Sequence, residues 1–167
     1  MKVFNNRGKS FTYIVFGIYL ILLIWLVLFK LSTSIDDIPH MRGINLIPFH
    51  YDEKTDFHLR EVLYNVIIFM PAGFYFTAFL EKRGKWYAVA VTALASILFE
   101  CLQWVFYLGA TDITDVMTNT LGGFLGMLLF IIMGKLFPKR RMTIINILGL
   151  FIEVSVCLLI VILTLAN

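Results

Sequence analysis

A row of polar side chains interrupts an apolar stretch of this chain, and it contains the residues whose types and spacing suit chemistry. The row lies between Phe99 and Leu121 and consists of Glu100, Gln103, Asp112, Asp115 and Asn119. A charged side chain at the centre of a bilayer costs about 2.5–3.5 kcal/mol on membrane-insertion scales. Crossing a membrane requires none of these groups, so their presence predicts a binding or catalytic site.

Glu100 and Gln103 are three residues apart, which places both side chains on one face of a helix. Two interpretations of this pair are open. In the first, the pair faces a cavity and binds a ligand or handles a proton. In the second, the two side chains bond to neighbouring helices and hold the bundle together, as polar residues in membrane helices often do.

Asp112, Asp115 and Asn119 also share one helical face, because they are separated by three and four residues. Thr111 or Asp112 suits the N-cap of a following helix, where a side-chain oxygen accepts a free backbone N–H. Acidic side chains near a helix N-terminus are further stabilised by the helix dipole. Capping accounts for one acid here and leaves Asp115 and Asn119, which lie deeper, as candidates for ligand binding.

Arg60 and Asn65 lie at the start of another apolar segment, where Glu61 and Asn65 share a helical face. The Arg60 guanidinium has three possible roles. It counters the acids of the polar row, holds an anionic ligand by a bidentate contact, or extends to the lipid headgroups. Glu153 stands alone in the last apolar segment, and we expect it to face another helix or a second copy of the protein.

The sequence leaves open whether the protein is an enzyme. Glu100 and Asp115 are the candidates for a catalytic acid/base pair. The chain contains no P-loop, no G-x-S-x-G and no H-E-x-x-H pattern. The histidines His40, His50 and His58 follow no known ligand spacing for zinc or calcium. We therefore expect no metal site and no cofactor.

The composition places these residues in an integral membrane protein. Hydrophobic residues make up 60% of the 167 residues and charged residues 15%, whereas soluble domains have about 45–50% and about 25%. Because about 20 apolar residues of helix cross a bilayer, the sequence predicts a single all-α membrane domain over 1–167. No basic stripe indicates nucleic-acid binding. Five transmembrane helices are expected, at residues 11–29, 62–80, 86–108, 116–133 and 142–165.

Lys and Arg residues are distributed unevenly between the two sides of this predicted bundle. One side has Lys30, Arg42, Lys54 and Arg60. The other side has Lys2, Arg7, Lys9, Lys82, Arg83, Lys85, Lys135, Lys139, Arg140 and Arg141. The positive-inside rule then predicts a cytoplasmic N-terminus and an external C-terminus. In that orientation the polar row and Asn65 lie near the outer leaflet.

Glycine and proline residues indicate how the helices pack. Gly122, Gly123 and Gly126 permit a close approach between helix backbones, which we expect between the fourth helix and the third. Pro71 lies inside the second helix and predicts a kink there. Residues 45–49, N-L-I-P-F, are apolar but too few to span a bilayer, so this segment either re-enters the membrane or lies on its surface.

Several motifs of this chain resemble those of the VanZ-like family of bacterial membrane proteins. They are N-L-I-P-F at 45–49, R-E-V-L-Y-N-V-I-I-F-M-P-A-G at 60–73, F-E-x-x-Q at 99–103, and G-A-T-D-I-T-D-V followed by N-T-L-G-G within 109–123. The resemblance covers roughly residues 13–135. The last predicted helix resembles the family only as a further apolar segment and contains none of these motifs.

The resemblance implies a multi-pass protein of the bacterial cytoplasmic membrane that confers low-level resistance to glycopeptide antibiotics, above all teicoplanin. Three functions are consistent with it. The first is an outward-facing polar cavity that binds or moves a lipid-linked envelope component or the lipophilic antibiotic. The others are an intramembrane acid/base enzyme acting on a lipid-linked cell-wall precursor, and a structural or assembly partner. The motif positions transferred as ligand-binding candidates are Arg60, Asn65, Glu100, Gln103, Asp112, Asp115 and Asn119.

Overall fold

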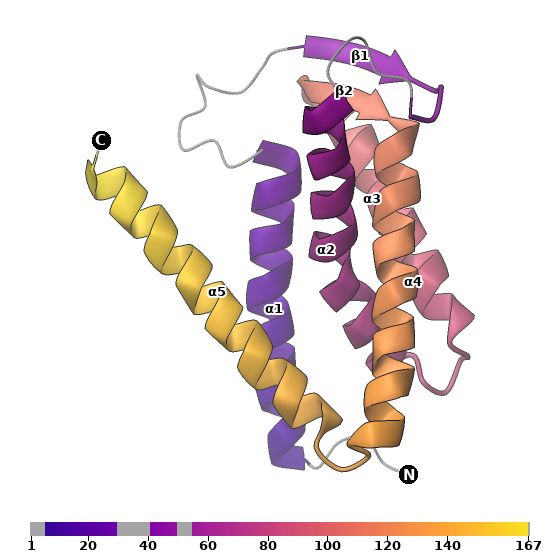
Figure 1. The fold of residues 1–167 in the computed structure, drawn as a ribbon, viewed down its shortest axis with the longest axis vertical. Helices are drawn as coiled ribbons and strands as arrows, with labels where there is room; N and C mark the ends of the chain where they lie inside the picture. Colours follow the sequence, from indigo (N-terminus) through magenta and orange to yellow (C-terminus); the bar gives the residue numbers. More distant parts are fainter. Residues whose placement is uncertain (1–5, 30–40, 50–54, 167) are drawn as a thin grey trace. The chain divides into compact units, whose positions relative to one another are not determined.

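Long helices dominate the structure, a computed structural model that describes residues 6–29, 41–49 and 55–166 (Figure 1). Each of the five helices contains a stretch long and apolar enough to cross a membrane. The prediction of an all-α membrane protein is therefore confirmed, and the orientation of the helices in the membrane stays a prediction. In chain order the elements are α1 (Asn6–Phe29), β1 (Met41–Asn45), α2 (Thr55–Phe79), α3 (Trp86–Val105), β2 (Leu108–Asp112), α4 (Ile113–Leu136) and α5 (Arg141–Ala166).

The chain forms two compact units. The α2–α4 unit, residues Ile38–Ile132, contains β1, α2, α3, β2 and most of α4. The α1–α5 unit, residues Met1–Asp37 and Met133–Asn167, contains α1, the end of α4 and α5. All seven candidate ligand-binding residues belong to the α2–α4 unit, so its internal packing decides how they are arranged.

Glycine residues bring α4 and α2 into backbone contact. A Cβ atom added to Gly122 would overlap the carbonyl oxygen of Val66, and one added to Gly126 would overlap that of Met70. Only a residue without a side chain fits at such a crossing, which is the usual role of small residues in membrane helix packing. The expected close packing is present, and its main partner is α2 rather than α3.

Gly123 is the position at which α4 also meets α3. A Cβ atom there would lie 2.6 Å from Cγ2 of Thr92, and a Cβ atom added to Gly73 of α2 would overlap the carbonyl oxygen of Gly123. Thr92 is fully buried, and its hydroxyl donates to the carbonyl of Ala88 at 2.9 Å, so its polar group is satisfied within α3. The three helices therefore converge at Gly123, where the Thr92 hydroxyl is hydrogen-bonded.

Aromatic side chains fill the rest of this packing layer. Phe69 of α2 meets Phe99 of α3 edge to face at 6.1 Å between ring centroids, and Phe74 meets Phe130 of α4 at 5.2 Å. Such edge-to-face pairs add about 0.5–1.5 kcal/mol beyond the burial of their surface. Pro71 lies between the two phenylalanines, and α2 continues through it as one helix.

A two-stranded parallel sheet, which the sequence did not predict, lies at the end of the unit where α2 and α4 begin and α3 ends (Figure 1). Its register runs from Met41 opposite Leu108 to Asn45 opposite Asp112. Tyr107 has a φ of 59°, a left-handed conformation that reverses the chain between α3 and β2. The third helix consequently ends at Val105, before the expected residue 108.

Residues 45–49 neither re-enter the bundle nor form a helix. Asn45 ends β1, and the following residues turn toward the start of α4, where the backbone N–H of Phe49 donates to Oγ1 of Thr114 at 3.1 Å. The side chains of Leu46, Ile47 and Phe49 are exposed. The segment is thus attached to α4 by its backbone and presents an apolar outer surface.

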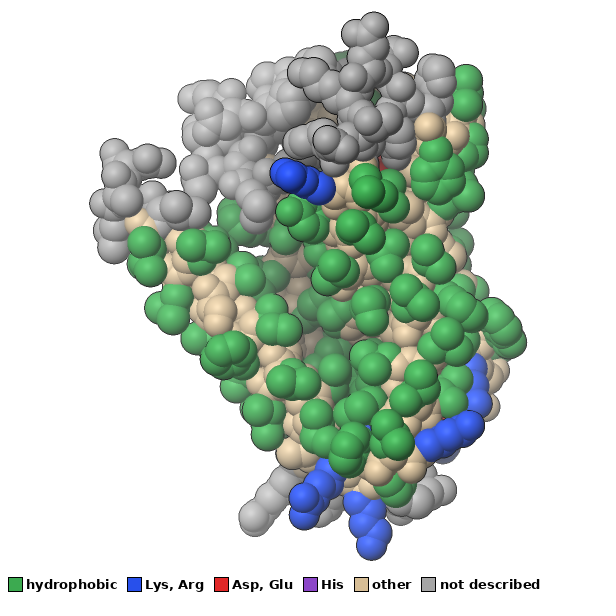
Figure 2. Space-filling model, in the orientation of Figure 1, with side chains coloured by type: hydrophobic (Ala, Val, Ile, Leu, Met, Phe, Trp, Pro, Cys, Tyr) green, Lys and Arg blue, Asp and Glu red, His purple; other side chains and the backbone are tan. Residues whose placement is uncertain are grey.

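In the α1–α5 unit, a hydrogen bond between buried side chains joins two strongly apolar helices. The Asn146 side chain donates to the hydroxyl oxygen of Thr12 at 2.8 Å, and that hydroxyl donates to the carbonyl of Gly8 at 2.8 Å. Of the 18 residues in the most apolar stretch of α5, only 11% are buried. Hydrophobic side chains cover the face shown in Figure 2, as expected for helices in contact with lipid.

Candidate functional site

The polar row is gathered where the C-terminal end of α3 meets β2. Glu100 and Gln103 are both buried, each with 3% of its surface exposed, which agrees with their predicted position on one helical face. Oε2 of Glu100 accepts the backbone N–H of Asp112 at 2.8 Å, and the Thr111 hydroxyl donates to the Glu100 carbonyl oxygen at 3.1 Å. The buried carboxylate therefore joins the end of α3 to the edge of the sheet.

Asp112 is the N-cap of α4. Its Oδ1 accepts the backbone N–H of Thr114 at 2.7 Å, and its Oδ2 accepts the Asn45 amide at 3.1 Å. Oδ1 of Asn45 in turn accepts the backbone N–H of Ile47 at 3.1 Å. The capping interpretation of Asp112 is confirmed, and the same carboxylate also fixes the end of β1. Negative charge at this helix terminus is favourable because the free N–H groups carry partial positive charge.

Asp115 and Asn119 connect α4 to two different helices. The Asn65 amide of α2 donates to Oδ1 of Asp115 at 2.7 Å. One turn further along α4, the Asn119 amide donates to the hydroxyl of Ser96 on α3 at 2.9 Å, and both residues are buried. Oδ1 of Asn119 has no hydrogen-bond partner in the described part of the chain. These contacts are of the interhelical kind that stabilises membrane bundles.

Arg60 differs from the other candidates because its side chain is exposed. It forms no hydrogen bond or ion pair with any residue that the structure describes, so nothing here supports its role as a counter-charge to Glu100, Asp112 or Asp115. Its guanidinium has several donors in a planar fork, a geometry that suits an anionic group. Of its predicted roles, ligand binding and contact with lipid headgroups remain.

The candidate residues thus form layers of increasing burial at one end of the α2–α4 unit. Arg60 is exposed and Asn65, Asp112 and Asp115 are half-buried, whereas Glu100, Gln103 and Asn119 are buried. Oε1 of Gln103 has no hydrogen-bond partner among the described residues. Hydrogen bonds to another side chain or to the backbone hold the remaining half-buried and buried side chains in position. Groups placed in this way can orient a ligand at the outer layer without rearranging, which lowers the entropy that binding must overcome.

Three residues of this network were missed by the sequence analysis. They are Asn45, Ser96 and Thr114. Asn45 begins the N-L-I-P-F motif, and Ser96 precedes Glu100 by one helical turn, so its position on the same face was detectable. Thr114 had no comparable signal because its partner, the Phe49 backbone, lies 65 residues away.

The three histidines cannot be compared with the prediction. His40 and His50 lie outside the described residues, and the His58 side chain is likewise not described. The expectation that they form no metal site stays a prediction.

Comparison with known proteins agrees with the arrangement of these motifs. The profile of the VanZ/LLP1 family matches residues 16–134, which include the whole of the polar network. The chain is 39% identical over 137 residues to Protein VanZ of Enterococcus faecium, and this alignment covers 81% of the chain and 83% of that protein. No solved structure matches the chain. The family match over most of the chain and the identity to a curated member agree, and the chain belongs to the VanZ/LLP1 family.

Proposed function

We propose that the protein confers resistance to glycopeptide antibiotics such as teicoplanin from the bacterial cytoplasmic membrane. In this proposal the polar end of the α2–α4 unit binds or moves a lipid-linked envelope component or the lipophilic antibiotic. One observation carries the proposal: an exposed guanidinium with no partner in the described chain lies at the same end as a network of fixed carboxylates and amides.

The distribution of basic residues supports an outward position for this end. The loop that joins α2 to α3 contains Lys82, Arg83 and Lys85, and it lies at the opposite end of the unit from β1 and β2 (Figure 1). Clusters of Lys and Arg near membrane helices favour the cytoplasmic side. The polar network then faces the outer surface, where glycopeptides encounter their targets.

The surface of α2 beside Arg60 suits a ligand with both a charge and a lipid tail. Leu59, Leu63 and Ile67 are exposed and spaced four residues apart, so they form an apolar row along one side of the helix. A ligand whose anionic group contacts Arg60 places its acyl chain along this row. The half-buried Asp115 and Asn65 then orient its polar part by hydrogen bonds.

The decisive test compares Arg60→Ala and Arg60→Lys with Arg83→Ala, an exposed arginine in the loop at the other end of the unit. Teicoplanin susceptibility and protein abundance are measured together in a host that expresses each variant. We expect Arg60→Ala to lose most of the resistance at unchanged abundance. Arg60→Lys should retain part of it, because a lysine supplies charge without the bidentate fork. Arg83→Ala should behave as the parent protein.

A second measurement uses purified protein and both ligand classes. Binding of teicoplanin and of a lipid-linked cell-wall precursor is measured for the parent and for Arg60→Ala. A loss of affinity for one of them identifies the ligand. Unchanged affinity for both, together with unchanged resistance, contradicts the proposal.

A structural role is the second candidate, because Asp112, Asp115 and Asn119 each connect separate elements of the fold. On that interpretation the protein supports the assembly of other membrane components and binds no small ligand itself. Resistance and abundance would then fall in parallel in every variant of the network, and Arg60→Ala would change neither.

A further inference from the structure

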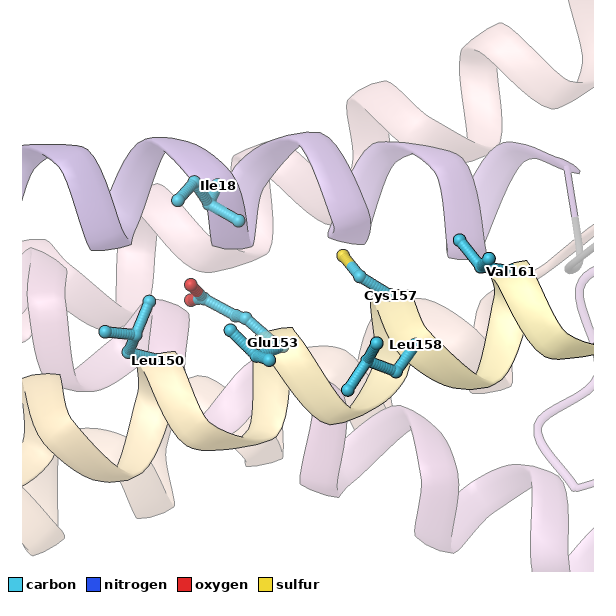
Figure 3. A pocket seen from close by; sticks show the side chains of 7 residues that line it. Ile18, Leu150, Glu153, Cys157, Leu158 and Val161 are labelled. Atoms are coloured by element: carbon cyan, nitrogen blue, oxygen red, sulfur yellow. The ribbon is translucent and has the colours of Figure 1, made fainter.

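A second buried carboxylate, far from the polar row in sequence, faces a cavity in the α1–α5 unit. The cavity has a volume of about 260 Å³ (Figure 3). It is lined by Ile18 of α1 and by Leu150, Glu153, Val154, Cys157, Leu158 and Val161 of α5. Apart from Glu153, every one of these side chains is apolar or, for the cysteine, only weakly polar.

Glu153 is buried in this apolar surrounding without a complete set of partners. Only 6% of its surface is exposed, and Oε2 has no hydrogen-bond partner in the described part of the chain. Figure 3 shows the carboxyl extending from α5 toward α1 between Leu150 and Cys157. Burying a polar group without a hydrogen bond costs about 1–3 kcal/mol by protein mutational measures. A ligand that donates a hydrogen bond to this oxygen would recover that cost.

Asn146 shows that α1 can provide a hydrogen-bond partner for a polar side chain of α5. It precedes Glu153 by seven residues, two helical turns on the same face of α5, and its amide donates to Thr12 of α1 at 2.8 Å. Opposite Glu153 the contribution from α1 is Ile18, which offers no donor. Cys157, one turn further along α5, offers only a weak S–H donor, so the described lining of the cavity contains no strong donor for Oε2.

The depth of Glu153 restricts which molecules can supply a donor. It lies 12 residues after Arg141, the first residue of α5, and 13 residues before Ala166, the last. At about 1.5 Å per residue this places the carboxyl roughly 18 Å along the helix from its nearer end. A phospholipid headgroup at the interface does not reach so far, whereas a donor carried by an apolar molecule can enter the hydrocarbon layer.

We propose that this cavity binds a slender lipophilic molecule that carries one hydrogen-bond donor, either the hydroxyl of a long-chain alcohol or the ammonium of an alkyl amine. The donor meets Oε2 of Glu153, and the chain lies against Ile18, Leu158 and Val161. The volume of about 260 Å³ lies below the range of about 300–1,000 Å³ that drug-sized ligands occupy, so the cavity suits a single slender chain. The proposal does not rest on the function proposed above, since α5 lies beyond the family match that ends at residue 134.

Covalent labelling by a hydrophobic carbodiimide gives a direct readout of this site in the purified full-length protein. Dicyclohexylcarbodiimide partitions into the apolar phase, where a protonated carboxyl adds across one C=N bond. The resulting O-acylisourea rearranges to a stable N-acylurea, so the labelled peptide gains the mass of one carbodiimide. We expect the label on Glu153 and its loss in Glu153→Gln, which preserves the side-chain shape.

Competition then tests whether the cavity binds the proposed class of ligand. 1-Decanol and decylamine are added before the carbodiimide, and decane, which has the same chain without a donor, is the matched control. We expect at least a threefold reduction of labelling by one of the two donors and none by decane.

Protection is measured as recovery of the unmodified Glu153 peptide, because an amine or alcohol that captures the O-acylisourea forms an amide or ester and releases the urea, which also removes the N-acylurea signal. Recovery with decanol identifies a neutral donor, whereas recovery with decylamine identifies a cationic one. Equal protection by decane, protection by neither donor, or absence of labelling in the parent protein overturns the proposal.

Discussion

Glu100 and Glu153 are buried to nearly the same extent, but they differ in the hydrogen-bond partners that their units provide. Glu100, with 3% of its surface exposed, receives the backbone N–H of Asp112 and belongs to a network that extends over three helices and a sheet. Glu153, with 6% exposed, has an oxygen without a partner in an apolar cavity. The hydrogen bond from Asp112 accounts for the burial of Glu100 by the fold alone. Glu153 has no such donor for Oε2 among the described residues, and its burial therefore suggests a bound ligand.

The two units also differ in how closely their helices pack. In the α2–α4 unit, glycine residues bring helix backbones so close that a methyl group does not fit. In the α1–α5 unit, a cavity lies between the helices, and an added Cβ at Gly17 meets nothing within 4 Å. The helix crossings of the α2–α4 unit are therefore tightly packed, whereas the α1–α5 unit has space beside Glu153. Substitutions at Gly126, Glu100 and Glu153, each paired with a control substitution, test this comparison.

The largest effect is expected from Gly126→Ala. Alanine is about 1 kcal/mol more favourable than glycine within a helix, so on propensity alone the change would stabilise α4. Its methyl group, however, would overlap the carbonyl oxygen of Met70. Overpacking of this kind costs about 1–3 kcal/mol or more. We expect a clear fall in the thermal unfolding temperature in detergent and reduced abundance in the membrane.

Gly17→Ala is the matched control for that substitution. The glycine lies within α1, where an added Cβ has free space, and only the propensity term applies. We expect an unfolding temperature equal to or slightly above that of the parent protein. A loss comparable to that of Gly126→Ala would show that the two units are packed alike and would remove the contrast.

A smaller effect is expected from changes at Glu100. Glu100→Ala removes the acceptor for the Asp112 backbone N–H, and a buried donor left without a partner costs about 1–3 kcal/mol. Glu100→Gln retains a carbonyl oxygen of the same reach and should recover most of that loss. Thermal unfolding of the two variants separates them. Equal unfolding temperatures for Ala and Gln would mean that this hydrogen bond contributes little to the fold.

Sequence reasoning located the helices and the polar row because both depend on local patterns. Long apolar runs identify spans, and the spacing of Asp112, Asp115 and Asn119 identifies a shared helical face. It also allowed for capping by Asp112, which the structure confirms. What each polar residue bonds to was not predictable, because the partners are distant: Asn65 is 50 residues from Asp115, and Asn45 is 67 from Asp112.

The small sheet and the cavity escaped prediction for related reasons. Strands of five residues such as M-R-G-I-N and L-G-A-T-D contain no sustained alternation, and their parallel pairing is defined only once α2 and α3 have brought them together. Glu153 was recognised as isolated in its helix. That it faces Ile18 beside an empty volume depends on the packing of α1 against α5, which no local pattern in the sequence specifies.

The smallest effect, opposite in sign to those of Gly126→Ala and Glu100→Ala, is expected from Glu153→Leu. Replacing a buried polar group that lacks partners by an apolar side chain of similar size is often neutral or stabilising, so the unfolding temperature should rise or stay unchanged.

Asn146→Leu, two turns away on the same face, is the control and removes the donor to Thr12. It should lower the unfolding temperature, because interhelical hydrogen bonds in membranes contribute about 0.6 and up to about 1.7 kcal/mol. If Glu153→Leu destabilised the protein as much as Asn146→Leu, the carboxyl would already have a partner in the native membrane protein. Glu153 would then resemble Glu100, and the cavity would need no guest.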